Sequence, residues 1–252
     1  MRLIRSQLFT LFLFLSTLTA AICIVSSAVV SKTMRFRITR RWAQANLWLV
    51  QKLCGVAYTV EGQEHLVQRD AVYYWKHQST FETIALFTLT PTAVVVLKNE
   101  LMRLPMVGWC FIVMGFVAID RNSGHSAVNQ VVRKGTASLD SGRTVVIFPE
   151  GTRMAPGRTR RYGVSGALLA ERSGRPIIPI AHNAGDFWPR RGLRKVPGTI
   201  RVVIGPPIET GGKKPADINR EASDWIEETM RKISPAYRNT ETEGEVQVQP
   251  ED

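Results

Sequence analysis

A histidine directly ahead of a helix start, with an acidic residue just inside that helix, is the first feature of the sequence that could do chemistry. His77 is followed by Ser79 and Glu82, and the Ser-x-x-Glu spacing is typical of a capping box, in which the glutamate folds back toward the serine. That geometry points the Glu82 carboxylate toward His77. An imidazole held by a carboxylate has one fixed tautomer and a stabilised protonated form, as a general base requires. The alternative is a structural histidine ahead of an ordinary helix.

A second such stretch is Phe-Pro-Glu-Gly-Thr-Arg at residues 148–153, where an apolar run stops at a proline. Gly151 permits a tight turn or a close backbone approach, and the guanidinium of Arg153 matches the geometry of a phosphate. Further arginines follow within ten residues and favour a cationic rim over a simple strand-ending turn. Arg121 and His182 each end another apolar run.

Short apolar runs alternate with amphipathic stretches through most of the chain. They predict the strands and helices that must position the candidate site residues. The predicted strands are residues 71–75, 93–97, 111–119, 144–148, 176–181 and 199–204. The predicted helices are residues 79–89, 126–141, 164–173 and 216–233. Such alternation indicates an α/β fold with a largely parallel central sheet flanked by helices. Because ligands bind beyond the carboxyl ends of parallel strands, one sheet edge can gather His77, Arg121 and Glu150.

The N-terminus predicts a membrane-associated helical segment. Residues 8–30 contain no charged residue, and 23 residues can cross a hydrocarbon core of roughly 30 Å. A cleaved signal peptide is the alternative, but the run is long for one and five bases follow it before residue 42. By the positive-inside rule these bases predict that the C-terminal body lies on the cytoplasmic side, whether the segment crosses the membrane or dips into it and returns. We expect the membrane to be a bacterial inner membrane. Residues 40–53 are predicted as an interfacial helix.

Composition restricts the class of partner. Lys and Arg number 33 against 21 acidic residues, a net charge of +12, so the chain is expected to meet an anionic surface, either phospholipid or nucleic acid. The apolar N-terminus favours membrane lipids and excludes nucleic acid. The widely spaced Cys23, Cys54 and Cys110 indicate neither disulfides nor a zinc site. We therefore expect a membrane segment at 1–56, an α/β domain at 57–238 and an acidic, disordered tail at 239–252.

Taken together, in this order and spacing, these stretches resemble the motif series of the 1-acylglycerol-3-phosphate (lysophosphatidic acid) acyltransferase family of glycerolipid acyltransferases. Residues 77–82 resemble its His-x4-Asp motif, Arg121 its phosphate-binding second motif, and residues 148–153 its third motif completely. Residues 178–180, Ile-Pro-Ile, resemble its fourth. The resemblance covers roughly residues 58–205 and the membrane segment.

The resemblance implies transfer of a fatty acyl group from a thioester to the free hydroxyl of a lysophospholipid, foremost 1-acylglycerol 3-phosphate. His77 would take the hydroxyl proton, Glu82 would orient His77, and backbone N–H groups at the start of its helix are candidate donors to the oxyanion. Arg121 and Arg153 would hold the phosphate. The glycerol portion would lie against Glu150 and Thr152, with Gly151 between them. The mechanism requires no cofactor or metal; acyl-coenzyme A or an acyl carrier protein would supply the thioester, the latter as a protein partner.

The sequence departs from the family pattern at and next to the first motif. Glu82 replaces the usual Asp, and Lys76 replaces Asn or a similar residue. One rival function is a membrane-anchored serine hydrolase, although the sequence has no Gly-x-Ser-x-Gly. Another is a non-enzymatic, basic lipid-binding protein. An acceptor other than 1-acylglycerol 3-phosphate, such as glycerol 3-phosphate, also remains open. Cys110 lies among apolar neighbours and is expected to be an inert thiol.

Overall fold

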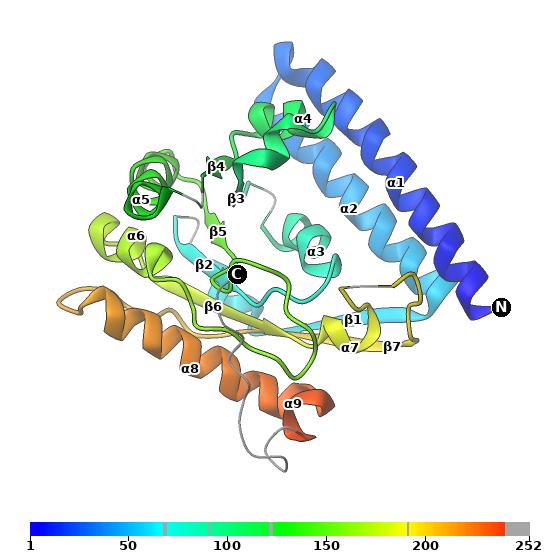
Figure 1. The fold of residues 1–252 in the computed structure, drawn as a ribbon. Coiled ribbons are helices and arrows are strands. Elements are labelled where there is room, and N and C mark those ends of the chain that lie inside the picture. Colours follow the sequence, from blue (N-terminus) through cyan, green and yellow to red (C-terminus); the bar gives the residue numbers. More distant parts are fainter. Residues whose placement is uncertain (68–69, 91, 121–122, 191, 240–252) are drawn as a thin grey trace.

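A seven-stranded sheet lies at the centre of the computed structural model, which describes residues 1–67, 70–90, 92–120, 123–190 and 192–239 (Figure 1). Its strands are β1 (Val56–Glu61), β2 (Val72–Trp75), β3 (Val94–Lys98), β4 (Val117–Ile119), β5 (Val145–Ile147), β6 (Ile177–His182) and β7 (Gly198–Ile204). Their order is β1-β7-β6-β2-β5-β3-β4. All neighbours pair in parallel except β6 and β7. The predicted α/β class with a largely parallel sheet is confirmed.

Helices cover both faces of this sheet because its central strands are apolar on both sides. In β2, Tyr73 and Trp75 face one cluster of buried side chains, whereas Val72 and Tyr74 face the other. The first cluster includes residues of α2 (Lys32–Cys54) and α3 (Phe81–Leu89). The second includes residues of α5 (His125–Asp140), α6 (Ser165–Ser173) and α8 (Pro215–Ile233). Figure 1 also labels the short helices α7 (Ala184–Phe187) and α9 (Pro235–Asn239).

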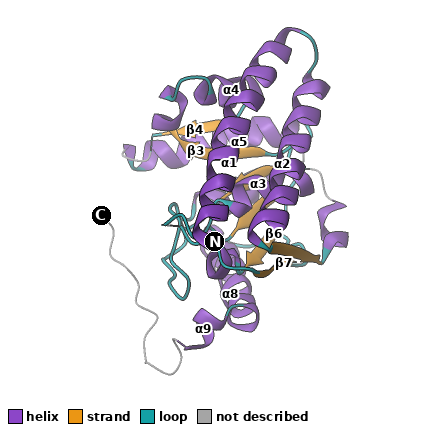
Figure 2. Cartoon of the chain, turned by 90° about the vertical axis from the view of Figure 1, so that its right-hand side faces the viewer, coloured by secondary structure: helices purple, strands orange, loops and turns teal. Residues whose placement is uncertain are grey.

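The N-terminal segment forms a helix pair. The first helix, α1 (Arg2–Ser26), turns through the 3₁₀ segment η1 (Ser27–Val29) and packs beside α2, as Figures 1 and 2 show. By length and composition it could cross a membrane, and it is mostly unburied. At its N-terminal end Phe9 packs edge-to-face on Trp188, with ring centroids 5.2 Å apart. The helix is therefore joined to the α/β domain and keeps an apolar outer face.

One predicted strand is only partly correct. Residues 111–119 form the end of α4 (Val107–Met114) and then the short strand β4. Gly115 ends the helix in the left-handed region at φ 69°, and its N–H donates to the carbonyl oxygens of Ile112 and Phe111. An uninterrupted apolar run carries no periodicity that separates a helix from a strand. The strand β1 was not predicted, and the tail after residue 239 lies outside the described residues.

Candidate active site

The register of two central strands brings the histidine motif at residues 77–82 and the third motif at residues 148–153 together. Tyr74 of β2 pairs with Ile147 of β5, so His77 and Glu150 each lie three residues beyond a paired position. The His77 backbone N–H donates to Oε2 of Glu150 at 2.8 Å, and the N–H of Met154 donates to the His77 carbonyl oxygen at 2.7 Å. The two loops therefore hold each other at the carboxyl edge of the sheet, as the strand pattern predicts.

Glu82 reaches back over the start of α3. Its Oε1 lies 2.8 Å from Nδ1 of His77 and accepts the backbone N–H groups of Gln78 at 2.9 Å and Ser79 at 2.8 Å. Oγ of Ser79 in turn accepts the N–H of Phe81 at 3.1 Å. The arrangement resembles a capping box, but Oγ of Ser79 accepts from Phe81 instead of Glu82, and the helix begins at Phe81 with Thr80 as its N-cap. The extra methylene of glutamate is absorbed because the side chain folds back onto the loop.

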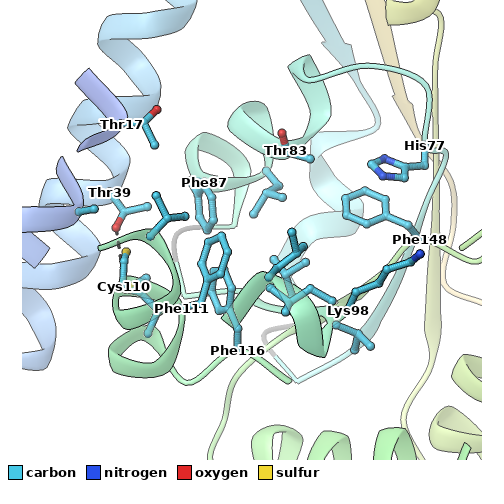
Figure 3. A pocket seen from close by; sticks show the side chains of 18 of the residues that line it. Thr17, Thr39, His77, Thr83, Phe87, Lys98, Cys110, Phe111, Phe116 and Phe148 are labelled. Atoms are coloured by element: carbon cyan, nitrogen blue, oxygen red, sulfur yellow. Dashed lines mark hydrogen bonds between the residues drawn. The ribbon is translucent and has the colours of Figure 1, made fainter. Parts of the chain in front are cut away.

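This arrangement fixes the tautomer of His77. Burial alone would raise the pKa of Glu82, but the imidazoles of His182 and His77 and the N–H of Ser79 outweigh it and lower that pKa from its usual 4.5. Glu82 is therefore an ionised acceptor, so Nδ1 of His77 carries the proton. Its Nε2 then keeps a lone pair. The ring stacks on Phe148, with centroids 4.1 Å apart (Figure 3), and the side chain is 15% exposed.

The same hydrogen bonds engage three of the N–H groups near the helix start. The N–H groups of Gln78, Ser79 and Phe81 all have protein acceptors. They are thus not free to stabilise a substrate oxyanion.

His182 lies behind Glu82 and is fully buried. Its Nε2 lies 2.7 Å from the carbonyl oxygen of Lys76, and its Nδ1 accepts the N–H of Ala184 at 3.2 Å. Burial lowers the pKa of His182 from its usual 6.5, so the ring is neutral with its proton on Nε2. That nitrogen lies 3.7 Å from Oε2 of Glu82, an oxygen with no hydrogen-bond partner among the described residues.

The third motif divides into two parts. Gly151, Thr152 and Arg153 line the same pocket as His77, and Nε of Arg153 is a buried donor without an acceptor in the described part of the chain. Glu150, in contrast, is fully buried behind the loop, where its Oε1 pairs with Nζ of Lys76 at 2.8 Å. Its carboxylate thus holds the loop instead of facing the pocket, which differs from the expected contact with glycerol. Arg121 lies outside the described residues.

The pocket is an apolar cavity of about 530 Å³ that runs from His77 toward the N-terminal helices. Figure 3 shows His77 and Phe148 at one end, Thr17 and Thr39 at the other, and aromatic rings between them. Its lining includes Leu86, Phe87, Val95, Phe111, Phe116 and, from α1 and α2, Thr17, Ala20, Ala21, Ile24, Thr39 and Trp42. A cavity of this size and polarity is typical of a binding site for a small apolar molecule.

Three lining residues bear on the sequence analysis. Lys98 and Arg190 were not predicted to lie at the site. Lys98 ends β3, so the rule that located His77 after a strand could have found it, whereas Arg190 lies in a loop without a local signal. The Nη1 of Arg190 donates to the carbonyl oxygen of Arg153 at 2.6 Å. Cys110 also lines the cavity, and burial raises its pKa to about 11, so its thiol is protonated at neutral pH.

Known proteins similar to this chain share one description. Residues 57–183 match the family model described as Acyltransferase. A 1-acyl-sn-glycerol-3-phosphate acyltransferase of Pseudomonas aeruginosa is 40% identical over 80% of this chain and 80% of its own length. The 1-acyl-sn-glycerol-3-phosphate acyltransferase alpha of Bos taurus is 26% identical over 92% of this chain and 78% of its own. The crystal structure of the 1-acyl-sn-glycerophosphate (LPA) acyltransferase PlsC from Thermotoga maritima has a TM-score of 0.77 at 19% identity and covers 92% of this chain and 97% of that one.

Proposed function

Because the chain belongs to the acyltransferase family that includes the 1-acyl-sn-glycerol-3-phosphate acyltransferases, we propose that it transfers a fatty acyl group from a thioester to 1-acylglycerol 3-phosphate and yields phosphatidic acid. One observation carries this proposal: a histidine with a free Nε2, held by a carboxylate, lies at the mouth of an apolar pocket beside Arg153 and Thr152. A base, an apolar cavity and a phosphate-binding cation are what this reaction needs.

The acyl group passes directly from the thioester to the acceptor hydroxyl, without a covalent acyl-enzyme. Nε2 of His77 takes the proton of the acceptor hydroxyl as the hydroxyl oxygen attacks the thioester carbonyl. The C–O bond forms, the C–S bond breaks, and the imidazolium returns the proton to the departing sulfur. Glu82 stabilises the imidazolium between these steps.

Arg153 and Thr152 supply the polar contacts. The unpartnered Nε–H of Arg153 suits a phosphate oxygen, and the Thr152 hydroxyl faces the same cavity as His77. These two groups, with Lys98 and Arg190, are further candidate donors to the oxyanion beside the remaining helix-start N–H groups. Arg121 keeps its expected phosphate-binding role as part of the proposal.

The apolar cavity accommodates the acyl chain, delivered on coenzyme A or on an acyl carrier protein. The apolar outer face of α1 lies in the membrane, where the lysophospholipid acceptor resides. The exposed bases Lys32, Arg37, Arg40 and Arg41 at the start of α2 meet anionic headgroups on the cytoplasmic side of the inner membrane.

Acyl transfer by the purified full-length protein, read by mass spectrometry over a panel of lysolipids and both thioester donors, tests the proposal. We expect 1-acylglycerol 3-phosphate to be the preferred acceptor. His77→Ala should reduce transfer about 1000-fold and leave binding to phosphatidylglycerol vesicles unchanged. His65→Ala, outside the pocket, is the matched control. Vesicle binding without transfer by the wild-type protein would instead identify a basic lipid-binding protein.

A further inference from the structure

A lysine lies fully buried directly behind the proposed general base. The side chain of Lys76 has 0% exposure, and its Nζ lies 2.8 Å from Oε1 of Glu150 and 2.7 Å from Oε1 of Glu227. The rings of Tyr162 and Tyr237 flank the ammonium at 5.8 Å and 5.3 Å. A buried lysine is rare unless it is paired, because removal of its charge from water costs several kcal/mol. Its position therefore needs an explanation beyond packing.

Glu150 links this ammonium to His77. One carboxylate oxygen pairs with Nζ of Lys76, and the other accepts the backbone N–H of His77 at 2.8 Å. The Lys76 peptide itself is held on both sides: its N–H donates to the carbonyl oxygen of Ile180 at 3.0 Å, and its carbonyl oxygen accepts from His182. Neither Lys76 nor Glu150 lines the pocket. The hydrogen bond from Glu150 to the His77 backbone gives this pair a direct contact with the proposed base.

Helix α8 closes the network from the other side. Glu227 accepts the hydroxyls of Tyr162 at 2.7 Å and Thr159 at 2.9 Å as well as the Lys76 ammonium. Tyr237 of α9 accepts the side-chain amide of Gln78 at 3.1 Å. Both helices lie after residue 183, where the match to the family model ends. The C-terminal helices thus support the loop that carries the base.

We propose that Lys76 is a positioning residue for acyl transfer, which fixes the Glu150 carboxylate so that it holds the His77 backbone and directs the imidazole at the pocket. Glu227 shares the ammonium and anchors it to α8. The inference rests on the proposed function, since it assigns Lys76 a role in that same reaction.

The charges around Glu150 give the inference a pH signature. The groups that face this carboxylate are Lys76, Glu227, Tyr162, Tyr237 and the His77 N–H. Burial raises the pKa of Glu150 to about 7, although Lys76 opposes that shift, and Glu227 adds to it. Loss of the Lys76 charge must raise this pKa further, and loss of the Glu227 charge must lower it. If the ionised carboxylate holds His77, activity should follow both changes.

The experiment compares the pH dependence of kcat for full-length Lys76→Met, Glu227→Gln and the double variant Lys76→Met/Glu150→Gln. Lys76→Met should lower kcat about 100-fold, leave the acceptor KM within about threefold and move the acid limb to higher pH. Glu227→Gln should move the acid limb to lower pH. The double variant should no longer show the acid-limb shift of Lys76→Met, because a glutamine at residue 150 does not titrate. Lys232→Met, which breaks an exposed pair with Glu228 on α8, is the matched control.

The outcomes separate the two proposals. Wild-type transfer together with unchanged kcat and pH profile in Lys76→Met overturns the positioning role alone. Absence of transfer in the wild-type protein overturns both. If thermal melting shows that Lys76→Met does not fold, Glu227→Gln decides, since Glu227 is partly exposed and the glutamine oxygen can still accept from Lys76. An acid limb at the wild-type pH in that variant refutes the inference.

Discussion

Replacement of Glu82 by glutamine separates the charge of the carboxylate from its geometry. Three N–H groups converge on its Oε1, from His77, Gln78 and Ser79, and a glutamine oxygen can accept all three. The amide nitrogen would take the place of Oε2, which has no hydrogen-bond partner in the described residues. The variant therefore keeps the loop and removes the negative charge that faces the imidazolium.

The distance between the two groups sets the size of the effect. At the 2.8 Å that separates Nδ1 from Oε1, a full imidazolium and a carboxylate attract each other by about 6 kcal/mol at an effective dielectric constant of about 20. A transition state with about half of that charge on the ring loses about 3 kcal/mol, which lowers kcat about 100-fold. The acceptor KM should change little, because Glu82 does not line the pocket.

Steady-state acyl transfer with a saturating thioester and varied lysolipid measures both constants. Glu82→Asp keeps the charge on a shorter side chain and should retain part of the activity. Glu228→Gln, at an exposed ion pair on α8, is the control for the same substitution elsewhere. A kcat within threefold of wild type in a folded Glu82→Gln protein would refute the orienting role of Glu82.

Three further predictions follow from the described contacts. Arg153→Ala should raise the acceptor KM about 10- to 100-fold by loss of a charge-assisted hydrogen bond to phosphate; an unchanged KM in lysolipid titrations would reject that contact. Gly166→Ala should lower the free energy of unfolding by about 1–3 kcal/mol in chemical denaturation, since its Cβ would clash with the Tyr74 ring. A Cβ at Gly163 has its nearest neighbour at 3.5 Å, so Gly163→Ala should lower it by under about 0.5 kcal/mol. Equal losses in the two variants would contradict the packing argument. Burial lowers the pKa of His182, so the unfolded chain takes up the proton first and stability is lost as pH falls below about 6.5. His182→Asn should reduce that slope between about pH 5 and 8, and parallel curves would count against a buried neutral ring.

Much of the fold was predictable because short, local sequence patterns determine its strands and helices. The strands around β2, β3, β5 and β6 are buried on both faces, so each is a short run of apolar residues between polar turns. The capping box placed Glu82 beside His77 for the same reason: the interaction spans only five residues. In contrast, β1 is half exposed and mixes polar with apolar positions, so no run marks it.

The remaining features depend on contacts far apart in the sequence. β7 runs antiparallel to β6, a choice of direction that neither strand encodes. Lys76 was visible only as an unusual residue before His77, because one of its partners, Glu227, is 151 residues away. Glu150 was expected at the substrate, and only its buried ion pair with Lys76 shows that the carboxylate turns inward instead.

The contribution of α1 to the pocket wall matters for how such an enzyme is handled. Thr17, Ala20, Ala21 and Ile24 all come from this helix. A shortened chain that begins at α2 would therefore open one side of the cavity. Detergent tails bring the same difficulty in the intact protein, because an alkyl chain that suits the outer face of α1 also suits the cavity beneath it. The detergent then acts as a competing ligand whose affinity depends on its chain length. Kinetics are therefore better measured in bilayer discs, which contain no detergent.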